Sequence, residues 1–203
     1  MVFFFTYIYI SGGWKEWVPG WMCGRSIKGS VVGIIGCGNI GTSIAEKLVN
    51  FKVSQLLYTS RSEKPAVKAI GGQLVTVDEL MERSDFVVVA AALNEDTKFI
   101  VSRERIAAMK SNAILVNIGR GQLVDQDALV EALREKRIRG AGLDVMTPEP
   151  LPLDHPLMGL DNVLLLPHIG TATFEMEEEM AMMTTQNILA VLDGCPMPNE
   201  VFF

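Results

Sequence analysis

The alternation of short apolar runs with amphipathic segments, which begins at residue 31, constrains the fold of this chain more than any other feature. The runs expected to be strands cover residues 31–35, 54–60, 85–92, 112–118, 137–145 and 162–167. The segments expected to be helices cover residues 39–51, 76–84, 102–109, 125–136 and 174–194. Short apolar strands that are buried on both faces and separated by helices indicate a parallel sheet with helices on both sides. We therefore predict an α/β fold with a doubly wound parallel sheet.

Capping residues mark several of the expected helix ends. Thr76 and Glu79 have the spacing of a capping box at the start of helix 76–84. Asp125 is the expected N-cap of helix 125–136, and Gly194 can terminate the closing helix. These signals support the helix assignments independently of the apolar pattern.

Length and charge limit the classes of function. The chain has 203 residues, room for one large domain, and it is 49% hydrophobic, which is ample for a buried core. A net charge of -6 argues against a general binder of nucleic acid or of anionic membranes, so any phosphate recognition must be local. The cysteines Cys23, Cys37 and Cys195 have no metal-ligand spacing. We expect no metal site and a reduced, cytoplasmic protein.

The first thirty residues differ in amino-acid pattern from the rest of the chain. The opening MVFFFTYIYI is too short to span a bilayer, which takes about 20 residues. No Lys or Arg precedes Lys15, whereas a secretory signal has a basic first region. We expect residues 1–30 to form an arm, residues 31–170 to form the sheet domain, and residues 171–203 to form a closing helix and tail.

The segment VVGIIGCGNIG places three glycines, Gly36, Gly38 and Gly41, after an expected strand and at the start of a helix. Dinucleotide sites need this arrangement for a tight turn, a close approach to the pyrophosphate and close packing of helix on strand. The helix N-terminus adds free N–H groups, which favours Asn39 and Ile40 as further contacts. We predict dinucleotide binding; the alternative is a glycine-rich turn that only packs.

The segment LLYTSRSEKP lies about 20 residues after the glycine motif, where NAD-binding chains carry an Asp or Glu for the ribose hydroxyl. Here the chain has Thr59, Ser60 and Arg61 instead. An acid would repel a 2′-phosphate, whereas Ser60 and Arg61 can bind it through charge-assisted hydrogen bonds. We predict NADPH as the preferred cofactor and weaker binding of NADH. The alternative is that Arg61 is an ordinary surface residue. Lys64 either adds to this positive patch or, as we favour, is a solvated loop lysine.

Three candidate reactive residues follow the last three strands: Arg120, Glu149 and His168. In a parallel sheet they emerge at the same edge as the glycine turn. A carboxylate beside a histidine orients the ring for acid–base chemistry, and an arginine can hold a carboxylate substrate. With a nicotinamide nearby, this set suits the reduction of a 2-oxo acid; the alternative is a structural ion pair. We expect the second histidine, His155, to be a turn residue.

The motifs VVGIIGCGNIG, VNIGRGQLVDQDALVEAL, GAGLDVMTPEPLPLDHPL and NVLLLPHIGTAT together resemble the D-isomer-specific 2-hydroxyacid dehydrogenase family, and most closely its branch that reduces glyoxylate and hydroxypyruvate. The resemblance implies a Rossmann-like NAD(P)-binding domain. It implies Arg120 as a substrate ligand, His168 as the acid–base group with Glu149 as its partner, and Asp144 near the nicotinamide. It also places further residues at the cofactor, namely Leu93, Ile118 and Gly170.

The resemblance further implies a second, substrate-binding domain, built largely from residues that precede the glycine motif. Because this motif begins at residue 36, we expect most of that domain to be absent and turnover to be impaired. The closing helix and tail, residues 171–203, would normally pack on that domain. The GGWKEW segment resembles a dimer contact of the family, which predicts a homodimer in which Trp17 either reaches the partner's cleft or packs under its own loop. Two alternatives stay open: a non-catalytic, dimerising NADP-binding fragment or regulator, and a dehydrogenase with another 2-hydroxy acid substrate.

Overall fold

The structure is a computed structural model, and it describes residues 12–13, 16, 19 and 23–200. The expectations for the opening MVFFFTYIYI and for Trp17 therefore fall outside the described residues.

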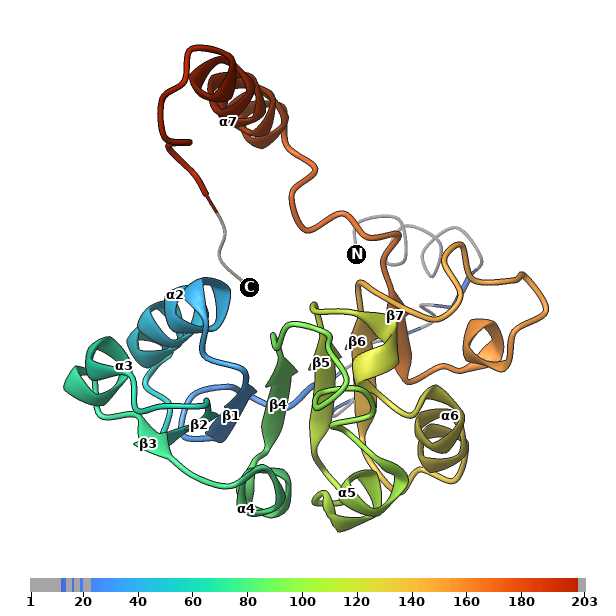
Figure 1. The fold of residues 1–203 in the computed structure, drawn as a ribbon. Helices are drawn as coiled ribbons and strands as arrows, with labels where there is room; N and C mark the ends of the chain where they lie inside the picture. Colours follow the sequence, from blue (N-terminus) through green and yellow to red (C-terminus); the bar gives the residue numbers. More distant parts are fainter. Residues whose placement is uncertain (1–11, 14–15, 17–18, 20–22, 201–203) are drawn as a thin grey trace.

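One seven-stranded sheet organises the molecule, and every neighbouring pair of strands in it is parallel. The strand order is β3-β2-β1-β4-β5-β6-β7, so the direction of winding reverses between β1 and β4. This order begins like that of a dinucleotide-binding sheet, and it confirms the predicted doubly wound α/β fold (Figure 1). The strands are β1 Val31–Ile35, β2 Gln55–Thr59, β3 Gln73–Leu74, β4 Phe86–Val89, β5 Ile114–Asn117, β6 Gly140–Leu143 and β7 Val163–Leu165.

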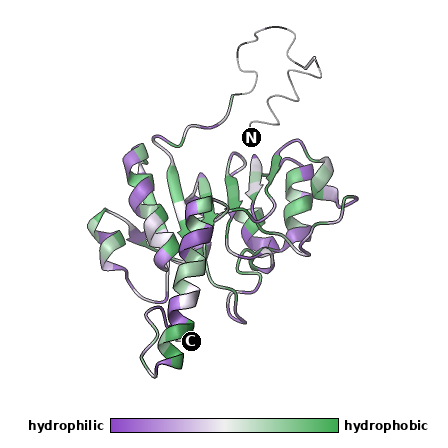
Figure 2. Ribbon diagram, turned by 90° about the horizontal axis from the view of Figure 1, so that it is seen from above, coloured by the Kyte–Doolittle hydropathy of each residue, from purple (hydrophilic) through white to green (hydrophobic). Residues whose placement is uncertain are grey.

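Helices cover both faces of this sheet. Side chains of α4, α5 and α6 share one apolar cluster with the sheet, whereas α2 and α3 pack in a second cluster on β1 and β2. Figure 2 shows the hydrophobic strands between these helices. The helices are α2 Asn39–Leu48, α3 Pro65–Ala69, α4 Val77–Arg83, α5 Arg103–Ala108, α6 Gln126–Arg134 and α7 Phe174–Leu192, with 3-10 turns η1 Val49–Phe51, η2 Gly121–Leu123 and η3 Pro156–Gly159.

The expectation that the strands are buried on both faces holds for β1 and β2 but is wrong for the centre of the sheet. In β4, Val87 and Val89 are buried while Phe86 and Val88 are only half-buried, and β5 alternates in the same way. The half-buried side chains lie on the face of α2 and α3, whose cluster is centred on β1 and β2. The described residues therefore bury β1 and β2 more fully than β4 and β5 on that face of the sheet.

The predicted caps are present, with one difference. Thr76 Oγ1 accepts the Glu79 N–H at 3.2 Å, but the Glu79 carboxylate pairs with Arg83, so only half of the capping box forms. Asp125 caps α6 by accepting the Ala128 N–H at 3.0 Å. The closing helix ends at Leu192, and Gly194 follows it with a φ of 70°, as a helix-terminating glycine does.

Helix α7 stands apart from the sheet and its covering helices (Figure 1). None of its residues is buried, although many of them are apolar. The exposed apolar side chains of this helix are Phe174, Met176, Met180, Met182, Met183, Ile188, Leu189, Val191 and Leu192. Within the described part of the chain, no helix is both long and apolar enough to cross a membrane.

Candidate active site

The three glycines after β1 have different surroundings. Gly36 has a φ of +92°, and a Cβ there would lie 2.5 Å from Cα of Ala91, so the turn requires glycine. A Cβ on Gly41 would lie 2.2 Å from the carbonyl oxygen of Gly36, because α2 packs closely on the turn. Gly38, by contrast, has nothing within 4 Å of the Cβ position. The space beside Gly38 is open next to the start of α2, which no side chain caps.

The segment after β2 holds the side chains expected to select the cofactor. Thr59 is buried, and its hydroxyl accepts the Gly36 N–H at 3.3 Å, so this residue supports the glycine turn. Ser60 is half-buried and Arg61 is exposed. The interpretation of Lys64 as a solvated loop lysine needs correction, because Lys64 is half-buried and its charge acts on Cys37 inside the glycine motif. Burial raises the pKa of the Cys37 thiol to about 11, and the nearby Lys64 ammonium opposes that rise.

Glu149 and His168 form a direct pair. Glu149 Oε2 lies 3.0 Å from Nδ1 of His168, and Glu149 Oε1 accepts the Met146 N–H at 2.9 Å. The hydrogen bond from His168 lowers the pKa of Glu149; partial burial opposes this effect, and the Met146 N–H and the charge of Arg120 add to it. Both side chains are partly open to solvent. The pair therefore combines an ionised carboxylate with a partly exposed imidazole ring, whose Nδ1 faces Glu149.

Asp144 fixes the backbone that carries His168. The Asp144 carbonyl accepts the His168 N–H at 3.0 Å, and its carboxylate oxygens accept the N–H groups of Ile169 at 2.9 Å and Gly170 at 3.1 Å. His168 itself has a φ of 54°, the left-handed conformation. Three consecutive backbone donors are thus held by one buried residue. Both oxygens of the Asp144 carboxylate therefore bind the loop that carries His168.

Arg120 lies on the neighbouring loop, after β5. Its Nη1 donates to the Gly119 carbonyl at 2.7 Å, so the guanidinium folds toward its own loop and remains exposed. Sequence reasoning missed Asn117, a buried residue that braces this loop. Asn117 Nδ2 donates to the Arg120 carbonyl at 2.9 Å and its Oδ1 accepts the Gly119 N–H at 3.1 Å. The charge of Arg120 still acts on the Glu149 carboxyl group.

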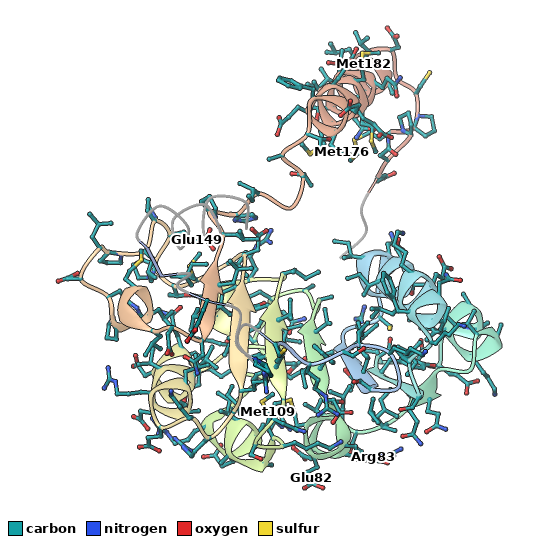
Figure 3. All side chains as sticks on the ribbon, turned by 180° about the vertical axis from the view of Figure 1, so that it is seen from behind. Glu82, Arg83, Met109, Glu149, Met176 and Met182 are labelled. Carbon is teal, nitrogen blue, oxygen red and sulfur yellow. The ribbon has the colours of Figure 1, made fainter. Side chains whose placement is uncertain are left out.

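The predicted residues gather at the carboxyl edge of the sheet. Arg120, Glu149 and His168 follow β5, β6 and β7, and the glycine turn follows β1. Figure 3 shows Glu149 at this edge and Met109 at the opposite one. The remaining predicted cofactor residues also lie beyond strand ends: Asn39, Ile40, Leu93, Ile118 and Gly170.

Other features lie away from this edge. A cavity of about 390 Å³ lies at the opposite edge, lined by residues that include Asn112, Lys136 and Asn162. Among the residues that the structure describes, no group of three or more His, Cys, Asp or Glu side chains could hold a metal ion. His155 is the N-cap of η3, and its Nδ1 accepts the Leu157 N–H at 3.2 Å, which confirms it as a turn residue.

Comparison with known families settles the relationship of the chain. Residues 7–170 match the family described as D-isomer specific 2-hydroxyacid dehydrogenase, NAD binding domain. The chain belongs to this family. The match confirms the resemblance predicted from the four motifs, and the family description indicates a nicotinamide dinucleotide as the cofactor.

Individual relatives agree with this assignment. The mouse glyoxylate reductase/hydroxypyruvate reductase is 44% identical over 192 residues, which are 94% of this chain and 58% of the relative. The crystal structure of the TT0316 protein from Thermus thermophilus has a TM-score of 0.90 at 40% identity, over 99% of this chain and 63% of that one. An acyclic imino acid reductase in complex with NADPH and D-Arg has a TM-score of 0.85 at 29% identity, over 98% of this chain and 62% of that one. The chain thus spans less than two thirds of the length of each.

Proposed function

We propose that this chain supplies the cofactor domain and the acid–base pair of a reductase that converts 2-oxo acids to 2-hydroxy acids with NADPH. The substrates we infer are glyoxylate and hydroxypyruvate, because the mouse relative carries both in its name and is 44% identical. The observation that carries the proposal is the 3.0 Å contact between Glu149 and His168 at the edge where the glycine turn lies.

NADPH fits the residues present at this edge. The open space at Gly38 and the uncapped start of α2 suit the pyrophosphate, and Ser60, Arg61 and Lys64 suit a 2′-phosphate. The acyclic imino acid reductase that shares this fold was solved with NADPH. The bound nicotinamide would supply a hydride to the 2-oxo carbon.

The protein side chains would then handle charge and the proton. Arg120 would bind the substrate carboxylate, since a guanidinium can hold a carboxylate through two parallel hydrogen bonds. His168 would donate the Nε2 proton to the carbonyl oxygen as the hydride reaches the neighbouring carbon, which gives the 2-hydroxy acid and NADP⁺. Glu149 would hold the ring through Nδ1 and stabilise its protonated form before transfer.

Substrate binding would also need a second domain. We infer that residues 171–203 pack on a substrate-binding domain, because α7 carries nine exposed large apolar side chains and buries none of its residues in this structure. Hydride transfer requires a substrate that is held in place and shielded from water. We therefore expect the chain alone to bind NADPH and to turn over substrate slowly, in a cytoplasmic homodimer.

An assay of NADPH oxidation with the purified chain tests the proposal. Adding hydroxypyruvate or glyoxylate should accelerate the loss of NADPH absorbance slightly, and His168→Gln should abolish that acceleration. Turnover at a rate typical of whole enzymes, about 1–10³ s⁻¹, would contradict the expected impairment of turnover in this chain. NADPH binding with no His168-dependent oxidation would favour the second candidate function, a non-catalytic NADP-binding module.

A further inference from the structure

Gln126, the first residue of α6, makes a paired contact with the loop that carries Glu149. Its Oε1 accepts the Thr147 N–H at 2.9 Å, and its Nε2 donates to the Thr147 carbonyl at 2.6 Å. The amide therefore binds both backbone groups of one residue, as a neighbouring strand would. Its orientation is fixed, because a flipped amide would set donor against donor and acceptor against acceptor.

Thr147 lies directly beside the backbone group that orients Glu149. The Met146 N–H donates to Glu149 Oε1, and the other oxygen of this carboxylate faces His168. On its other side the 146–147 backbone packs on Gly121, where a Cβ would lie 2.1 Å from the Met146 carbonyl oxygen. The loop is thus held between the backbone of η2 and the side-chain amide of Gln126.

The helix start that carries Gln126 is itself anchored. Asp125 caps α6, and the Asp125 N–H donates to the Val101 carbonyl at 3.0 Å. Nε2 of Gln126 also lies 3.2 Å from Nε2 of His155, whose other ring nitrogen faces the Leu157 N–H. A neutral imidazole has one acceptor nitrogen, so His155 can accept only one of these two bonds at a time. The paired bonds to Thr147 are therefore the main contact of the Gln126 amide.

We propose that Gln126 is a positioning residue for the Glu149–His168 pair. By holding Thr147 it keeps the Met146 N–H on Glu149, and it keeps the Glu149 carboxylate turned toward Nδ1 of His168. This arrangement selects the tautomer of neutral His168 that carries its proton on Nδ1. The inference rests on the proposed function only for the catalytic use of the pair, since the positioning itself can be measured without turnover.

Long-range ¹H–¹⁵N NMR of the ¹⁵N-labelled full chain tests this role, because imidazole nitrogen shifts report which ring nitrogen carries the proton. The spectra are recorded well above the ordinary histidine pKa of about 6.5. The chain has two histidines, and the pattern that disappears in His168→Gln belongs to His168. We expect an Nδ1–H pattern for His168 in the unmodified chain. In Gln126→Leu we expect loss of that pattern in favour of the Nε2–H tautomer.

Gln122→Leu is the matched control, since the Gln122 side chain is exposed and makes no hydrogen bond to the described residues. It should leave the His168 pattern unchanged. Should Gln126→Leu fail to fold, Gln126→Glu decides the matter. That variant keeps the acceptor for the Thr147 N–H but sets an oxygen against the Thr147 carbonyl. We therefore expect a smaller shift of His168 from the Nδ1–H to the Nε2–H tautomer.

An unchanged His168 pattern in a folded Gln126 variant would overturn the proposal. An Nε2–H pattern in the unmodified chain would overturn it as well. These outcomes are separate from those of the proposed function. A tautomer change in Gln126→Leu, with no His168-dependent NADPH oxidation by the unmodified chain, would support the positioning role and contradict the reductase. Oxidation by the unmodified chain, with no tautomer change in Gln126→Leu, would support the reductase and contradict the positioning role.

Discussion

The Glu149 carboxylate and the His168 imidazole lie 3.0 Å apart, although 19 residues separate them in the chain. Each follows a different parallel strand: Glu149 accepts the Met146 N–H of its own loop, whereas the His168 N–H donates to Asp144, which follows β6. Because the His168 hydrogen bond lowers the pKa of Glu149, this carboxyl group stays ionised throughout the neutral range. The pair therefore has a fixed negative charge on one side of the ring.

Removing that charge should slow proton transfer without affecting the cofactor. Glu149→Gln keeps the size of the side chain, but the neutral amide cannot stabilise a protonated imidazole. We expect His168-dependent NADPH oxidation to fall by about 10²-fold. The dissociation constant for NADPH, measured by fluorescence titration, should stay within about twofold. Undiminished oxidation in this variant would show that Glu149 has no part in the reaction.

Arg61 should account for much of the preference for NADPH. Arg61→Ala removes a charged hydrogen bond worth about 1.5–3 kcal/mol, so NADPH should bind about 10- to 100-fold more weakly while NADH binding stays the same. Arg134→Ala, an exposed arginine on α6, is the control for a change in net charge. Equal weakening of both cofactors in Arg61→Ala would contradict a contact with the 2′-phosphate.

Two glycines of one motif should respond differently to the same substitution. Gly41→Ala sets a Cβ 2.2 Å from the Gly36 carbonyl, which should lower the free energy of unfolding by about 1–3 kcal/mol. Gly38→Ala meets no atom within 4 Å, so it should leave stability intact but occupy the space inferred for the pyrophosphate. Urea unfolding and NADPH titration of both variants separate the two effects. Unchanged NADPH affinity in Gly38→Ala would place the cofactor elsewhere.

Asp85, at the opposite edge of the sheet, should control stability in acid. Burial opposes its ionisation, but the Val31 N–H at 2.8 Å and the charges of Lys110 and Arg25 outweigh burial and lower the pKa of Asp85. A carboxyl group with a lowered folded-state pKa contributes stability above its unfolded pKa, about 3.9, and loses it as the pH falls through the folded value.

Asp85→Asn is therefore expected to cost about 2 kcal/mol at pH 7, and the cost should shrink below about pH 4. Urea unfolding of both proteins across this range measures the difference. Asp78→Asn is a suitable control, because that carboxylate is largely exposed in its pair with Arg105. A cost that did not depend on pH would show that ionisation of Asp85 does not stabilise the fold.

Local sequence patterns predicted most of the fold because they reflect local physics. Apolar runs predicted the longer strands. Side-chain caps such as Thr76 and Asp125 act within three residues of their own position. The helix α3 and the strand β3 were missed, since five and two residues are too short to show a period. Helix α7 leaves its apolar residues uncovered, and the packing of this helix on a second domain stays a prediction.

The edge at which the site residues gather was predicted as well, because parallel strands place their following residues together. What the sequence did not reveal were the residues that hold the site in place. Asn117 acts within its own loop, but Gln126 reaches Thr147 across 21 positions, and such a pair leaves no spacing signal. Thr59 stands in the same segment as Ser60 and Arg61, and only the three-dimensional contact with Gly36 shows that its hydroxyl supports the glycine turn.

Calorimetric titration of the purified chain with NADPH and, separately, with NADH tests the central claim most directly. The claim is that the glycine turn and the Ser60–Arg61 segment together form a site selective for a 2′-phosphorylated dinucleotide. We predict saturable binding of NADPH and clearly weaker binding of NADH. Equal affinities for the two cofactors, or no binding of either, would contradict it.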